Sequence, residues 1–176
     1  MKRFIVVSGA AVLLGSVAEA QATPTFAGTW KVVPNVAPAT QPPGARAPAT
    51  MGSGWASEIA ITQDANTLTL EYTPYAASDI QPMWTFVYPL TGAESKQWIN
   101  TGHGDREQLS RAIWDGNRLV ISTTQRFRNP DTGALMTSEV RRALSLDSAG
   151  SLVVETTYVG VLGGPTSTTR TLYSRN

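Results

Sequence analysis

The side chains that most often carry out catalysis or bind metals are scarce in this sequence. It has no cysteine and one histidine, His103, which lies between two glycines in a predicted turn. This excludes thiolate and multi-histidine metal sites, and a Ser-His-Asp arrangement would need the turn held rigidly beside a serine. Glu71, Glu139 and Glu155 lie opposite the apolar faces of their strands, whereas a general acid needs a desolvated carboxyl group. We predict no catalytic residue, metal or cofactor, which favours a binding protein while leaving the enzyme class open.

A second set of side chains is better suited to bind a ligand, because alternation along the predicted strands turns them towards a common interior. The set consists of aromatic rings and one cation: Tyr72, Trp84, Phe86, Tyr88, Phe127, Arg142 and Tyr158. The rings either fill a packed core, as in many small barrels, or line a ligand cavity. Small residues at Ser110 and Ala112, on one face of a neighbouring strand, would favour the cavity if that face is internal.

The cation of this set is predicted to be buried. Arg142 shares a strand face with Val140 and Leu144, and a buried guanidinium is costly unless it is paired. It therefore either stacks on an aromatic ring in a structural role or pairs with the carboxylate of a bound ligand.

The last predicted strand carries two further arginines, one on each of its faces. Arg170 shares a face with Leu172, while Tyr173 and Arg175 occupy the opposite face. Both faces carry one large apolar or aromatic residue, so alternation leaves open which of them points inward.

Short strands in succession would position all these side chains. Apolar and polar residues alternate from Phe26 to Arg175, and turn signals such as Asp115-Gly116-Asn117 recur at the spacing of an all-β meander. No segment keeps a helical period, so little or no helix is expected. We predict a single antiparallel up-and-down β-barrel of about eight to ten strands, since closure removes exposed edges. A two-layer sandwich is the alternative, but it needs several long crossings.

The N-terminus has the composition of a signal peptide. Lys2 and Arg3 precede an apolar run, residues 4–17, and Ala18-Glu19-Ala20 matches the small-x-small cleavage pattern. We therefore predict a signal peptide at residues 1–20 and a periplasmic or secreted domain at residues 21–176. The apolar run is too short to span a bilayer, and no later segment approaches that length.

The charge of the predicted mature chain argues against nucleic acid as a partner. Removal of the signal leaves 12 Lys+Arg and 12 Asp+Glu, with no basic run. The oligomeric state does not follow from the sequence.

One predicted link is long. Thirteen of the 21 residues in 34–54 are Pro, Ala or Gly, a composition that neither packs a core nor holds a helix. This segment is either a disordered surface loop or a flap over one mouth of the barrel, with Trp55 as an anchor for its returning end.

Gly28-Thr29-Trp30, which opens the first predicted strand, resembles the Gly-x-Trp signature of the lipocalin-like calycins. The later Trp114-Asp115-Gly116-Asn117 and Leu119-Val120-Ile121 are similar to the pattern of secreted bacterial lipocalin-like proteins of unassigned function. The resemblance implies a barrel base built from Gly28 and Trp30, on which an arginine of the last strand packs. We expect this arginine to be Arg170, with Arg175 as the alternative.

The resemblance, together with the aromatic interior, implies binding of a small, largely apolar molecule inside the barrel without turnover. Two other functions stay open. The outer face and the long loop could engage another protein, as in an inhibitor, or the barrel could house an isomerase or decarboxylase by analogy of fold.

Overall fold

The computed structural model describes residues 23–34, 52–74, 83–100, 105–129, 132–159 and 165–176. The predicted signal peptide, most of the long link and His103 lie outside these ranges. The described residues contain ten strands and no helix, and hence no helix that could span a membrane. The strands are β1 (Gly28–Val32), β2 (Glu58–Gln63), β3 (Thr67–Tyr72), β4 (Trp84–Pro89), β5 (Glu94–Asn100), β6 (Asp105–Asp115), β7 (Arg118–Arg128), β8 (Leu135–Leu146), β9 (Leu152–Val159) and β10 (Ser167–Arg175).

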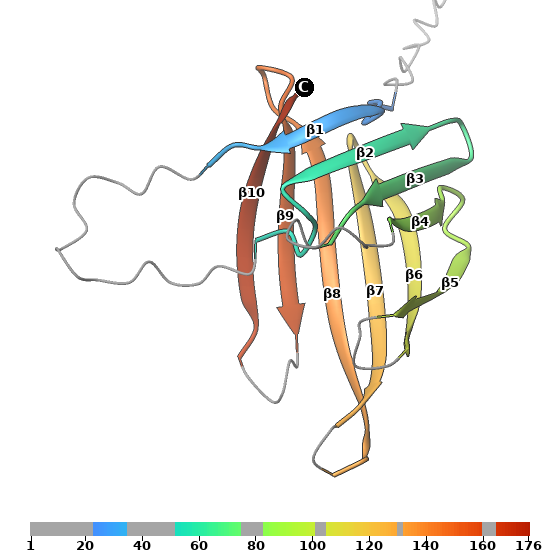
Figure 1. Ribbon diagram of the computed structural model, residues 1–176. Helices are drawn as coiled ribbons and strands as arrows, with labels where there is room; N and C mark the ends of the chain where they lie inside the picture. Colours follow the sequence, from blue (N-terminus) through green and yellow to red (C-terminus); the bar gives the residue numbers. More distant parts are fainter. Residues whose placement is uncertain (1–22, 35–51, 75–82, 101–104, 130–131, 160–164) are drawn as a thin grey trace, which may run out of the picture.

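All ten strands form one antiparallel sheet in the order β4-β3-β2-β1-β10-β9-β8-β7-β6-β5. The long strands β6–β10 form one side, and the short strands β1–β4 cross them at a steep angle (Figure 1). Pairing of β1 with β10 joins the two ends of the chain and brings the edges β4 and β5 together, so the barrel is nearly closed. The predicted up-and-down barrel is confirmed, and the architecture is compatible with a calycin-like fold.

Alternation decides which side chains fill the barrel. In β3, Leu68, Leu70 and Tyr72 are buried, and the residues between them are only partly covered. The turn before this strand is fixed by Asp64, whose Oδ1 accepts hydrogen bonds of 2.7 Å from the backbone N–H groups of Asn66 and Thr67. Such an aspartate turn sets the hairpin register, and the register keeps the apolar face of the strand inward.

One end of the barrel is built around Trp30, whose side chain is fully buried. Its Nε1 donates a 2.8 Å hydrogen bond to the backbone oxygen of Phe26, and the ring of Phe26 stacks on Trp114. The guanidinium carbon of Arg175 lies 4.8 Å from the centroid of the Trp30 ring. Gly28 makes room for this arginine, because a Cβ there would lie 3.2 Å from Nη1 of Arg175.

The prediction that Arg170 stacks on Trp30 is therefore wrong, and the alternative, Arg175, holds this position. The β1–β10 register places Arg175 directly opposite Trp30, and Tyr173, on the same face, is fully buried. Arg170 has the opposite parity along the strand and is exposed, paired in register with Glu155 of β9. The error is a shift of one residue in the assignment of the inward face.

Candidate functional site

The interior of the barrel holds a cation, Arg142, that has no counter-charge among the described residues. Arg142, on β8, is 7% exposed, as its alternation with Val140 and Leu144 predicted. Its Nε donates a 2.7 Å hydrogen bond to the backbone oxygen of Ser53, and its guanidinium carbon lies 5.3 Å from the centroid of the Trp55 ring. None of the ion pairs formed among the described residues includes Arg142. The backbone oxygen of Ser53, the face of the Trp55 ring and the Tyr158 hydroxyl are thus its described partners, and all three are uncharged.

Buried hydroxyl groups surround this cation. Thr156 lies directly across from Arg142 in the β8–β9 register and is fully buried, and Tyr158 is the next inward residue along β9. Neither the Thr156 Oγ1 nor the Tyr158 Oη has a hydrogen-bond partner of good geometry within the described ranges. Two buried hydroxyls beside a guanidinium that has no described carboxylate partner form a polar group that can donate hydrogen bonds to an acceptor.

Burial raises the pKa of four tyrosines that lie within the electrostatic reach of Arg142, and its positive charge opposes the rise. These residues are Tyr72, Tyr88, Tyr158 and Tyr173. The pKa of Tyr88 rises to about 12. The phenols therefore stay protonated at neutral pH and act as hydrogen-bond donors, not as anionic partners of the arginine.

The segment that leads into β2 covers the cation from within; we call residues 52–57 the inner hook. The Oγ of Ser53 is hydrogen-bonded to the Tyr173 hydroxyl at 2.6 Å and accepts a bond from the Trp55 N–H at 3.1 Å. Thr169 Oγ1 donates to the Gly52 oxygen at 2.7 Å, and the Tyr173 hydroxyl donates to the oxygen of Ala56. The expectation that Trp55 anchors the returning end of the long link agrees with this network, although residues 35–51 are outside the described ranges.

Close approach explains the glycine in the inner hook. Gly54 has a φ of +73°, and a Cβ there would lie 2.6 Å from Tyr158 Oη and 2.9 Å from Arg142 Nη2. The backbone therefore passes against the polar group with no room for a side chain.

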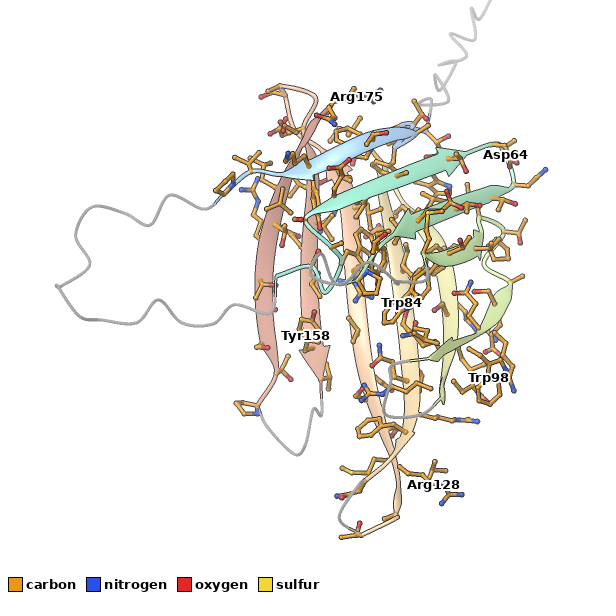
Figure 2. All side chains as sticks on the ribbon, in the orientation of Figure 1. Asp64, Trp84, Trp98, Arg128, Tyr158 and Arg175 are labelled. Atoms are coloured by element: carbon orange, nitrogen blue, oxygen red, sulfur yellow. The ribbon has the colours of Figure 1, made fainter. Side chains whose placement is uncertain are left out.

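Four rings form an aromatic wall beside this polar group: Tyr72, Trp84, Phe86 and Tyr88. The rings of Tyr72 and Phe86 stack with centroids 5.6 Å apart, Phe86 and Tyr88 with centroids 6.4 Å apart, and Trp84 packs against the first two. Figure 2 shows Trp84 and Tyr158 on strands at opposite sides of the curled sheet. The wall therefore comes from β3 and β4, whereas the polar group comes from β8 and β9.

The last of the predicted ligand-binding residues lies apart from the others. Phe127, near the end of β7, is partly buried, and the Arg106 guanidinium lies over its ring at 5.5 Å. No described ring contact joins it to the aromatic wall. The structure thus gathers six of the seven predicted residues around one interior.

A groove with a volume of about 240 Å³ opens beside the aromatic wall, between β4 and β5. It is lined by Met83, Trp84, Thr85, Phe86, Gln97, Trp98 and Ile99. The sequence analysis missed Gln97, Trp98 and Ile99 because the groove depends on how two strands separate. It also missed Ser53 and Thr156 as site residues, although alternation did turn Thr156 inward.

The carboxylates do not assemble into an acid–base pair or a metal site in the described part of the chain. Glu139 is exposed, and Glu155 pairs with Arg118 outside the barrel. No group of three or more His, Asp or Glu residues in the described ranges could hold a metal ion. No protein-family model matches the chain, and no curated protein or solved structure shows significant similarity to it.

Proposed function

We propose that this protein binds a small, largely apolar molecule inside the barrel, with its apolar body against the aromatic wall and an acidic group at Arg142. One observation carries the proposal: the guanidinium is buried beside the hydroxyls of Tyr158 and Thr156, with no described carboxylate paired to it. Stability alone would not favour this arrangement, since an uncompensated buried charge costs several kcal/mol.

A ligand carboxylate would complete the polar group. Nε of Arg142 already donates to Ser53, which leaves the two terminal nitrogens of the guanidinium fork for a second acceptor. Hydrogen bonds to charged groups contribute about 1.5–3 kcal/mol, which corresponds to about tenfold to hundredfold in Kd. Because Arg142 is buried, such a pair would be shielded from solvent, which strengthens it.

The aromatic wall would hold the rest of the ligand. Three of its four rings are buried and Trp84 is partly buried, so the wall is mostly apolar, and its hydroxyl-bearing members, Tyr72 and Tyr88, lie within the electrostatic reach of Arg142. An amphipathic molecule with one acidic end matches this polarity. In keeping with the resemblance of the sequence, we place the chain among exported lipocalin-like binding proteins.

Two measurements test this function. Native mass spectrometry of the protein purified from its own host should show a bound small molecule. After delipidation, the apo protein should bind 1-anilinonaphthalene-8-sulfonate, an apolar anion, in a fluorescence titration. R142M should weaken this dye by about tenfold or more. R141M is the matched control, because Arg141 is the neighbouring residue on the outer face of the same strand and is exposed.

Three results would contradict the proposal. The wild-type protein could bind neither a native ligand nor the dye, or R141M could weaken the dye as much as R142M does. The chain could also supply its own counter-charge from a carboxylate outside the described ranges. Asp79→Asn would then lower stability and, by freeing the arginine, tighten binding of the anionic dye, whereas we expect it to change neither.

A further inference from the structure

The barrel has one seam, between β4 and β5. These strands follow each other in the chain through a short turn, residues 90–93, yet they are the one consecutive pair without a backbone ladder. Among the described residues, a hydrogen bond of 2.8 Å crosses the seam from Gln97 Nε2 to the backbone oxygen of Val87. The seam is therefore fastened midway along β5 and separates beyond this bond, as the splayed strands in Figure 1 show.

The groove of about 240 Å³ lies at this seam and is lined by residues of both faces of the sheet. Successive residues of a strand point to opposite faces, and the groove is lined by consecutive residues of both strands. Its inner lining includes Phe86, a buried member of the aromatic wall, and Ile99, which is also buried. Its outer lining includes Met83 and Trp98, which is 63% exposed.

Widening the seam costs less than parting any other pair of neighbouring strands. Elsewhere a whole ladder of backbone hydrogen bonds would break, whereas here one side-chain hydrogen bond holds the strands in the described part. The Gln97 amide is itself only half satisfied, since its Oε1 is buried without a hydrogen-bond partner. An exposed tryptophan and methionine at the outer mouth offer an apolar first contact.

We infer that the ligand enters and leaves the barrel sideways, through the β4–β5 seam. This inference rests on the proposed function and adds its route. The ligand that fits this route is narrow, a flat ring or an unbranched apolar chain, since ligand pockets usually measure about 300–1,000 Å³ and this groove alone holds only part of a ligand. The acidic group then reaches Arg142 along the aromatic wall.

Stopped-flow kinetics with 1-anilinonaphthalene-8-sulfonate test the route. Gln97→Ala removes the fastening and should raise the association and dissociation rates together by about fivefold, with little change in Kd. Thr85→Trp adds bulk at the outer mouth, where Thr85 is exposed, and should slow both rates. Ser95→Ala, on the same strand outside the groove, and Thr62→Trp, on the outer face of β2, are matched controls and should change neither rate.

The outcomes separate the route from the function. If the dye binds the wild type and both seam variants leave its rates unchanged, the entrance lies elsewhere and the inference is overturned, while the proposed function stands. A changed Kd at an unchanged association rate would also overturn it, because the seam would then be part of the bound site. If the wild-type protein does not bind the dye, both proposals fail.

Discussion

Replacing Arg175 with alanine should destabilise the barrel, and replacing Arg170 should not. The Arg175 guanidinium covers the Trp30 ring at 4.8 Å, and Trp30 is the centre of one barrel end. A cation over an aromatic ring contributes about 0.5–1 kcal/mol at an exposed site and about 2 kcal/mol when desolvated. Because Arg175 is exposed, we expect the lower part of this range plus the lost cover of the ring, about 1 kcal/mol in total.

Thermal unfolding followed by far-UV circular dichroism measures this effect. For a chain of this size, about 1 kcal/mol corresponds to a fall in Tm of about 2–4 °C. Arg170→Ala is the matched control, on the same strand but on its exposed face, and should stay within about 0.5 kcal/mol of the wild type. A loss in R170A with none in R175A would show that the last strand faces the other way and would refute the reasoning.

Three further predictions concern the tyrosines, the inner hook and the N-terminus. Burial raises the pKa of Tyr88 and three other tyrosines above the usual 10.0, so the unfolded state loses their protons first as pH rises. Their stabilising contribution is therefore full below about pH 10 and falls above it, by up to about 1.4 kcal/mol per pH unit for each tyrosine, which chemical unfolding at several pH values measures. Gly54→Ala should destabilise the protein by about 1–3 kcal/mol, because Gly54 has a positive φ and a Cβ there would meet Tyr158. Gly116→Ala is the control: Gly116 also has a positive φ but open space around it, so the change should cost only about 1 kcal/mol in the same unfolding assay. Cleavage after Ala20 should give the mature mass in an exported fraction; an intact N-terminus there would contradict the predicted signal peptide.

Much of the fold followed from alternation and turn chemistry. In β8, Val140, Arg142 and Leu144 occupy one face, and all three are buried as predicted. The turns could be recognised by their Asp, Asn and Gly residues. An up-and-down succession of about eight to ten strands could therefore be predicted, and the structure has ten among the described residues. The aromatic wall and the buried arginine followed from the same rule, because each lies on a strand with one clearly apolar face.

The remaining features of the fold and of the site depended on which strands pair with each other. The alternation of side chains along a single strand does not specify that pairing. β10 carries Leu172 on one face and Tyr173 on the other, and only its pairing with β1 decides between them. The inner hook begins with Gly52-Ser53-Gly54, and its role arises from hydrogen bonds to strands far along the chain. At the seam, the strands β4 and β5 are not joined by a ladder of backbone hydrogen bonds. The sequence of neither strand alone predicts this gap.

We propose above that Arg142 receives the acidic end of an apolar ligand. Isothermal titration calorimetry with decanoate and with decanol, on the wild-type protein and on R142M, tests it most directly. We predict that the wild type binds decanoate about tenfold to hundredfold more tightly than decanol, and that this preference disappears in R142M while decanol binding is retained. Equal affinities of the wild-type protein for the acid and the alcohol, or a preference for the acid that survives in R142M, would contradict the claim.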